Sequence, residues 1–230
     1  MLELNKLYLM DCMEGMREFP DKYFDLAIVD VPYGIKISSR KSLGSPAPFG
    51  GKKNKSIIKK NINPTVYKIK DWDDDAPDKS YFDELIRVSK NQIIWGANHF
   101  ISRTPYDSSC WIVWDKQTTA DYADAELAYT SFKTAVRIFR FKWSGCLQEN
   151  MKNKEIRIHP TQKPVQLYKW ILHNYAKPDY KIIDTHVGSG SSIIAFLDYG
   201  CEWIGFEIDP DYHKAAIKRI EIHQMQTKLF

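Results

Sequence analysis

The stretch from Lys181 to Glu207 constrains the fold of this chain most strongly, because it has the pattern of a βαβ unit. A short apolar run leads into a turn with two glycines, and the helix-like stretch Ile193–Tyr199 follows. The next apolar run, Glu202–Glu207, ends in an acid 23 residues after Asp184. Since parallel strands need a crossover that is usually helical, this pattern predicts an α/β fold with a mostly parallel sheet.

The same unit has the features of a nucleoside-binding site. Gly188 and Gly190 allow the backbone to approach a ligand closely, and an acid at the position of Glu207 accepts hydrogen bonds from ribose hydroxyls. A dinucleotide fingerprint would have a third small residue where this chain has Ile193, and no P-loop pattern occurs. The residues therefore favour S-adenosylmethionine over NAD or FAD. The alternative is an ordinary glycine turn with an incidental acid.

A second candidate site follows the apolar run Leu26–Val29, which predicts a buried strand of a parallel sheet. The next four residues, Asp30, Val31, Pro32 and Tyr33, combine a carboxylate, a stiff turn and an aromatic ring. Ligands of such sheets bind beyond the carboxyl ends of the strands, so Asp30 lies where chemistry is expected. The combination can bind a flat ring that carries an amino group. Taken alone, the tetrapeptide can also be a simple turn.

Four motifs, in this order along the chain, resemble those of DNA amino-methyltransferases of the permuted, beta type. Residues 30–33 resemble the D-P-P-Y motif, residues 159–164 the H-P-T-x-K-P segment, residues 184–191 the D-P-F-x-G-S-G-T motif, and residues 205–209 the acidic strand end. The resemblance covers nearly the whole chain. It departs from the family pattern where Val31 replaces the first proline, and where Thr185 and His186 replace Pro and Phe.

This resemblance implies a Rossmann-like methyltransferase fold with a mostly parallel, seven-stranded sheet and a circularly permuted motif order. It implies S-adenosylmethionine as the methyl donor, double-stranded DNA as the partner, and a place in DNA methylation or restriction-modification. The catalytic residues would be Asp30, Val31, Pro32 and Tyr33. The cofactor-binding residues would be Asp184, His186, Gly188, Ser189, Gly190, Ser191, Glu207, His159, Thr161 and Lys163.

The chemistry of an exocyclic amine explains why the tetrapeptide carries a carboxylate. The lone pair of the amine is delocalised into the ring, so a site must accept both amine hydrogens, and Asp30 and the carbonyl of Val31 are the candidate acceptors. A base inside a duplex must be flipped out to be methylated, as in methyltransferases as a class. Tyr33 can then stack on the base, a contact worth about 1–3 kcal/mol. The reaction needs no metal and no covalent enzyme intermediate.

Three functional hypotheses remain open. The first is transfer to the N6 amine of adenine, favoured because Asp30 opens the tetrapeptide, where cytosine-amine enzymes of the family more often have Ser. The second is the same chemistry on the N4 amine of cytosine or on RNA. The third is a non-catalytic nucleic-acid-binding relative, which the altered residues Thr185 and His186 leave open.

Length and cysteine spacing set further limits. The 230 residues suit a single α/β domain, residues 1–230. The four cysteines form no C-x-x-C pair and no compact set with histidine, so neither a zinc site nor a disulfide framework is predicted: Cys12, Cys110, Cys146 and Cys201. No secretory signal and no apolar stretch of membrane length occur, which predicts a cytoplasmic protein without membrane contact. A homodimer stays open.

Two segments are predicted to contact DNA. Residues 35–70 hold ten Lys or Arg and no acid, against a net charge of +4 for the whole chain. Their glycines and prolines predict a mobile basic loop that closes over DNA, with a solvated surface insertion as the alternative. Residues 144–158 are the expected short target-recognition segment, with Lys152, Lys154 and Arg157 as candidate contacts.

Hydrophobic patterns and helix-end signals predict the remaining elements. Strands are expected at Leu7–Met10, Leu26–Asp30, Gln92–Trp95 and Trp111–Trp114, a ribbon of two paired strands at Ala125–Phe132 and Ala135–Trp143, and helices at Asp11–Glu18, Tyr81–Lys90 and Val165–Ala176. A last helix is expected to start at Pro210 with Asp209 as its N-cap. This alternation predicts a sheet covered by helices on both faces.

Overall fold

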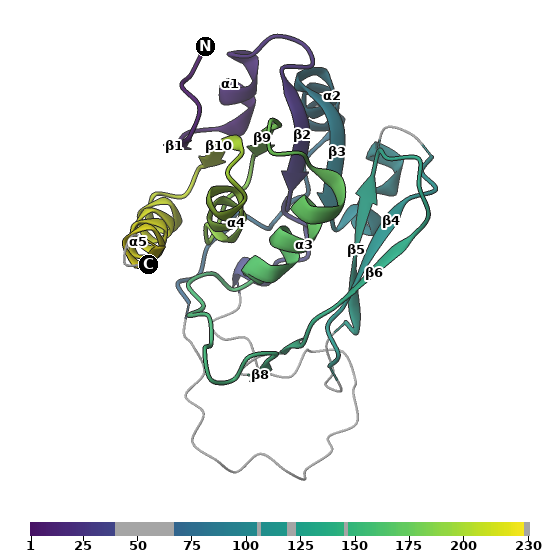
Figure 1. The fold of residues 1–230 in the computed structure, drawn as a ribbon. Coiled ribbons are helices and arrows are strands. Elements are labelled where there is room, and N and C mark those ends of the chain that lie inside the picture. Colours follow the sequence, from purple (N-terminus) through teal and green to yellow (C-terminus); the bar gives the residue numbers. More distant parts are fainter. Residues whose placement is uncertain (40–66, 105–106, 119–122, 145–146, 228–230) are drawn as a thin grey trace.

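The computed structural model describes residues 1–39, 67–104, 107–118, 123–144 and 147–227. Its centre is an eight-stranded sheet in the order β1-β10-β9-β2-β3-β5-β4-β6 (Figure 1). The strands of this sheet are β1 (Lys6–Leu9), β2 (Phe24–Val29), β3 (Ser89–Trp95), β4 (Trp111–Asp115), β5 (Ala125–Thr130), β6 (Arg137–Arg140), β9 (Lys181–Asp184) and β10 (Glu202–Glu207). The strands from β1 to β3 in this order pair in parallel, and β5 is antiparallel to both of its neighbours. The predicted mostly parallel sheet is confirmed, with eight strands instead of seven.

The predicted pairing of Ala125–Phe132 with Ala135–Trp143 is wrong. Both segments form strands, but β4 lies between them, antiparallel to β5 and parallel to β6. The burial of side chains explains the order. Ile112 and Trp114 of β4 are buried, which suits a strand inside the sheet. β6 carries the exposed Arg137 and Arg140, which suit a strand at the edge of the sheet.

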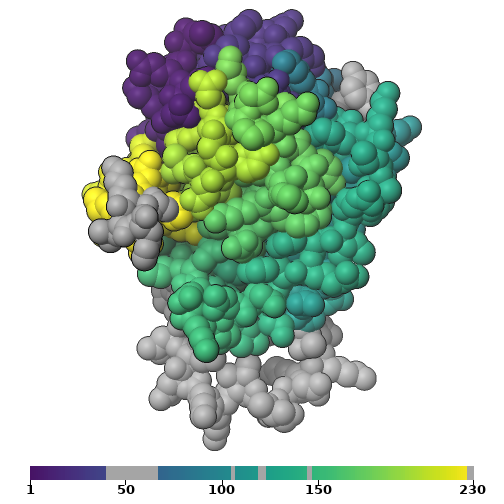
Figure 2. Space-filling view, viewed as in Figure 1, coloured from purple at the N-terminus to yellow at the C-terminus, as the bar shows by residue number. Residues whose placement is uncertain are grey.

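Helices cover both faces of the sheet. They are α1 (Cys12–Arg17), α2 (Lys79–Val88), α3 (Val165–Tyr175), α4 (Ser191–Tyr199) and α5 (Pro210–Thr227). Along β2, Leu26 and Ile28 belong to the core under α3 and α4, and Ala27 and Val29 to the core under α1 and α2. In Figure 2, the green atoms of α3 lie beside the yellow-green atoms of α4 on the face in view. The continuous apolar run of β2 is therefore buried on both sides, as the sequence predicts.

Helix ends follow the predicted capping chemistry. The carboxylate of Asp209 accepts hydrogen bonds from the backbone N–H groups of Asp211 (2.9 Å) and Tyr212 (3.1 Å), which confirms it as the N-cap of α5. Asp11 and Asp78 cap α1 and α2 in the same way. Each such cap is worth about 1 kcal/mol.

The parallel strands bring the predicted site residues to one edge of the sheet. β2 ends next to Asp30, β9 at Asp184 and β10 at Glu207. The short hairpin of β7 (Trp143–Ser144) and β8 (Leu147–Gln148) is separate from the main sheet, and in Figure 1 β8 lies at the end of the molecule toward which β2 runs. Most of the predicted basic loop at 35–70 lies outside the described residues. Within the described part of the chain, no helix is long and apolar enough to cross a membrane.

Candidate active site

The carboxylate of Asp30 lies just after the carboxyl end of β2, and hydrogen bonds to one of its two oxygens hold it in place. Oδ1 accepts hydrogen bonds from the Lys163 ammonium at 2.5 Å and from the Tyr33 hydroxyl at 2.9 Å. No described residue donates to Oδ2, and the side chain is 16% exposed. Burial raises the pKa of Asp30, and the nearby ammonium offsets part of this effect. One carboxylate oxygen is therefore available for a ligand.

Tyr33 is placed by a glycine and a histidine. Gly96 has φ +71°, and a Cβ at this position would lie 2.0 Å from Cε1 of the Tyr33 ring, so only glycine leaves room for the ring. The exposed His99 stacks on Tyr33 with ring centroids 4.9 Å apart and planes 17° apart. Stacking of Tyr33 on a target base stays a prediction, and His99 is an aromatic neighbour that the sequence reasoning missed.

Asp73 fixes the turn that follows the tetrapeptide. Its side chain is 1% exposed, and Oδ1 accepts hydrogen bonds from the backbone N–H groups of Tyr33 (2.7 Å) and Gly34 (3.1 Å). Oδ2 accepts a third, from the backbone N–H of Ile37 at 2.9 Å. A single carboxylate thus satisfies three donors of the loop. The sequence reasoning missed it, because nothing distinguishes Asp73 from the exposed acids beside it.

The turn between β9 and α4 has the predicted glycine geometry. Gly188 (φ +53°) and Gly190 (φ +77°) adopt the left-handed conformation that favours glycine. The N–H of Gly188 donates to Oε2 of Glu207 at 2.7 Å, and Oε1 of Glu207 accepts from the N–H of Asp209 at 2.8 Å. The buried Asp184 accepts from the Ser192 hydroxyl and from the N–H of His186, and burial raises its pKa to about 7. The structure thus brings the two acids and the turn together.

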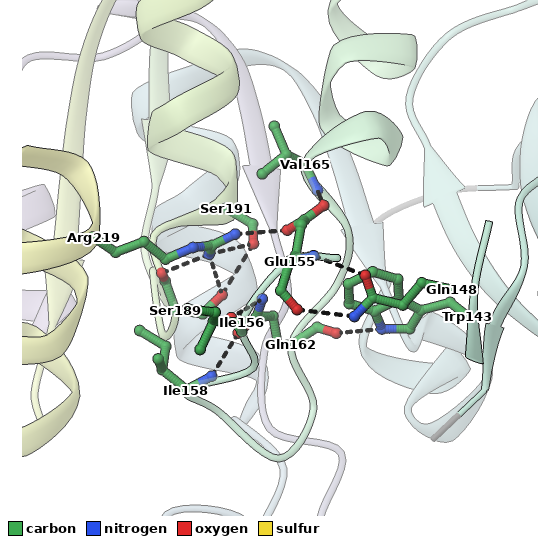
Figure 3. A network of polar contacts seen from close by, with 10 residues as sticks. All are labelled: Trp143, Gln148, Glu155, Ile156, Ile158, Gln162, Val165, Ser189, Ser191 and Arg219. Carbon is green, nitrogen blue, oxygen red and sulfur yellow. Dashed lines mark hydrogen bonds and ion pairs between the residues drawn. The ribbon is translucent and has the colours of Figure 1, made fainter. Parts of the chain in front are cut away.

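Two serines predicted to bind the cofactor contact an arginine of α5 (Figure 3). Arg219 donates to the carbonyl of Ser189 at 2.9 Å and to the hydroxyl of Ser191 at 2.8 Å. Its guanidinium also pairs with Glu155 at 2.6 Å. Glu155 belongs to the predicted target-recognition segment, so this network joins that segment to the β9–α4 turn. Neither Arg219 nor Glu155 was singled out from the sequence.

The residues of the 159–164 segment face two different places. The buried His159 borders the β9–α4 turn, since a Cβ on Gly188 would lie 3.8 Å from its ring. Its Nδ1 accepts from the backbone N–H of Thr161 at 3.3 Å, and its ring lies 4.2 Å from that of Tyr212. Lys163 was grouped with the cofactor residues, but its ammonium contacts Asp30. The Lys163 ammonium therefore lies beside the turn that follows β2, and its predicted contact with the cofactor stays a prediction.

The imidazole of His186 provides a test of the electrostatics of the β9–α4 turn. Burial lowers the pKa of His186 to about 4, so the folded protein keeps the imidazole neutral where the unfolded chain, with a pKa near 6.5, takes up a proton. The stability from this group is present above pH 6.5 and is lost as the pH falls toward 4. We expect His186→Gln to remove this loss. The check is the difference in unfolding free energy between wild type and variant from pH 7 to 4.5.

The exposed His173 of α3 provides the control for this measurement. His173→Gln makes the same substitution at an exposed position, so the comparison separates the effect of the position from that of the substitution. An identical slope for wild type and His186→Gln would contradict the assignment of a neutral imidazole at His186.

Within the described ranges, no group of three or more His, Cys, Asp or Glu is arranged to hold a metal ion. Cys12, Cys110 and Cys201 are free thiols, and Cys146 lies outside the described residues.

Comparisons with known proteins agree with this geometry. A family model described as DNA methylase, of the N6/N4 type, matches residues 52–218. YubD of Escherichia coli (strain K12) is 24% identical over 215 residues, which cover 91% of this chain and 87% of YubD.

Two solved structures share the fold. The complex of M1.HpyAVI with SAM has a TM-score of 0.53 at 17% identity and covers 93% of this chain and 98% of that one. The cytosine-N4-specific PvuII DNA methyltransferase has a TM-score of 0.57 at 12% identity, with 96% and 91% covered. The predicted Rossmann-like methyltransferase fold is confirmed.

Proposed function

Since the chain belongs to the N6/N4 DNA methylase family, we propose that it transfers a methyl group from S-adenosylmethionine to the N6 amine of adenine in double-stranded DNA. One observation carries the proposal. Asp30 lies at the same sheet edge as the Gly188 turn and Glu207, and no described residue donates a hydrogen bond to its Oδ2. An amine acceptor site and a nucleoside site therefore adjoin.

The residues of the β9–α4 turn fit S-adenosylmethionine. The left-handed Gly188 lets the backbone approach a ligand, and the atoms nearest to a Cβ placed there belong to the flat ring of His159. Each oxygen of Glu207 accepts one backbone N–H, and a carboxylate oxygen has a second acceptor site for a ribose hydroxyl. When bound, S-adenosylmethionine supplies an electrophilic methyl group on a sulfonium.

The tetrapeptide supplies the acceptors for the target amine. Oδ2 of Asp30 and the carbonyl of Val31, to which no described residue donates, accept the two amine hydrogens and turn the nitrogen lone pair out of conjugation. As the nitrogen gains positive charge, the carboxylate stabilises it, and such fixed electrostatic groups are commonly worth a factor of about 10²–10³ in rate. The base must leave the duplex to reach this edge of the sheet.

The choice of adenine rests on Asp30 itself. By resemblance, enzymes that methylate the cytosine amine more often have Ser at this position, so the N4 amine of cytosine is the second candidate. The test is incubation of the purified protein with unmethylated duplex DNA and labelled S-adenosylmethionine, followed by nucleoside analysis. N6-methyladenine supports the proposal. N4-methylcytosine would replace it by the second candidate, and duplex binding without any methylation would indicate a non-catalytic relative.

Contact with DNA is proposed for the segment 144–158. Lys152 and Lys154 are exposed, whereas the guanidinium of Arg157 packs 4.5 Å from the centre of the Trp143 ring. The two lysines are therefore better placed than Arg157 to meet phosphates. The basic loop, a homodimer and a cytoplasmic location remain predictions from the sequence.

Glu207→Ala is expected to weaken the binding of S-adenosylmethionine by about 10- to 100-fold, since hydrogen bonds to a charged acceptor are worth about 1.5–3 kcal/mol. Affinity for duplex DNA should be unchanged. Calorimetric titration with the cofactor measures the effect. Glu202→Ala, at the exposed start of the same strand, is the matched control. Equal cofactor affinity for both variants would contradict the assignment of Glu207.

A further inference from the structure

A buried ammonium joins Asp30 to a second carboxylate. Lys163 is 3% exposed, and its ammonium contacts Oδ1 of Asp30 at 2.5 Å and Oε2 of Glu126 at 3.0 Å. The hydroxyl of Tyr33 is 3.1 Å away. The ammonium donates hydrogen bonds to Asp30 and Tyr33 and forms an ion pair with Glu126. Lys163 therefore has one defined position, and it fixes the position of Oδ1.

Glu126 anchors this lysine from the other half of the sheet. It lies on β5, and its second oxygen pairs with the ammonium of Lys116, just after β4, at 2.5 Å. The cluster of Lys116, Glu126, Lys163 and Asp30 holds two positive and two negative charges. A buried charge that loses its partner is strongly destabilising, so the four groups constrain one another. The family motifs include Asp30 and Lys163 but not Glu126 or Lys116.

We propose that Lys163 and Glu126 are positioning residues for methyl transfer: Glu126 holds Lys163, and Lys163 holds Oδ1 of Asp30 so that Oδ2 faces the incoming amine. This inference rests on the function proposed above and extends it to two residues that act through Asp30. Glu126 also balances the charge of Lys163. Without Glu126, the full ammonium charge acts on Asp30 and weakens it as an acceptor for the amine hydrogens.

The two residues act on Asp30 in opposite directions. Burial raises the pKa of Asp30, Lys163 lowers it, and Glu126 raises it. The other ionisable groups that face Asp30 are Tyr33, Tyr168 of α3 and Asp184 of β9. Because the amine needs the ionised carboxylate, the acidic limb of the pH–rate profile follows the pKa of Asp30. Glu126→Gln should move this limb to lower pH, and Lys163→Met should move it to higher pH.

The experiment compares wild type, Glu126→Gln, Lys163→Met and Lys169→Met. Lys169, on α3, pairs with Asp198 at 2.6 Å outside this cluster and serves as the control. Measurements are kcat and KM for duplex DNA as a function of pH, and the titration of the Asp30 carboxyl carbon by NMR in the free protein. We expect kcat of both cluster variants to fall by at least about tenfold, with KM within about twofold, and the two titrations to shift in opposite directions.

Two outcomes would overturn the inference: rates equal to those of Lys169→Met, or titrations that shift in the same direction. If Lys163→Met does not fold, Glu126→Gln still tests the inference. Its kcat should fall, and the NMR titration of Asp30 should move to lower pH. If the wild-type protein methylates no DNA, the proposed function fails. The NMR titration still tests the arrangement of the cluster in that case, so the two failures are distinguishable.

Discussion

Asp30→Ala is expected to reduce methyl transfer by about 10²- to 10³-fold, because it removes the charged acceptor for the target amine. Affinity for S-adenosylmethionine should stay within about twofold, since the cofactor is assigned to the Gly188 turn and Glu207. The fold should survive the change. Lys163 keeps Glu126 as its counterion, 3.0 Å away, so no buried charge is left without a partner. Single-turnover transfer of labelled methyl groups to duplex DNA measures the rate.

Two further variants test this prediction. Asp30→Asn keeps the shape but presents an amide that donates hydrogen bonds as well as accepting them, so it should lose most of the activity. Asp83→Ala removes an exposed carboxylate of α2 that pairs with Lys79, and should leave the rate unchanged. An active Asp30→Ala protein would show that another group accepts the amine.

The elements of the fold were predictable where the signal is local. The apolar runs of β2, β9 and β10 and the Asp209 cap of α5 are set by neighbouring residues, and they occur within a few residues of the predicted bounds. The pairing of β5 was not predictable in this way. Two strands that follow each other in the sequence can pair directly or can pair with a third strand that lies between them. Here the third strand is β4, which precedes both in the chain and has a buried face.

The motif residues meet at the expected sheet edge, but several of their partners were missed. Asp73 lies 40 residues after Tyr33, and Glu155 lies 64 residues before Arg219. Glu126, on β5, reaches Lys163, which lies just before α3. None of these contacts leaves a periodic or spaced pattern in the sequence. Lys163 shows that a long side chain can contact a residue far away in the sequence, here Asp30.

Asp73→Ala is expected to destabilise the protein and to impair methyl transfer together. The variant leaves the backbone N–H groups of Tyr33, Gly34 and Ile37 without their acceptor. At about 1 kcal/mol or more for each donor, the free energy of unfolding should fall by about 3 kcal/mol. For a chain of this length, the midpoint of thermal unfolding should fall by about 6–12 °C. Calorimetry and the methyl-transfer rate, measured well below that midpoint, check both effects.

The loss of activity should follow from the movement of Tyr33. Its ring packs closely against Gly96, and its hydroxyl donates a hydrogen bond to Asp30, so a displaced Tyr33 loses both contacts. Asp73→Asn separates the two effects. Its remaining carbonyl oxygen can still accept from Tyr33 and Gly34, so activity should recover more than stability does. Asp74→Ala changes an exposed neighbour and should alter neither quantity. If Asp73→Ala unfolds at the same temperature as Asp74→Ala, the catalytic turn does not depend on this carboxylate.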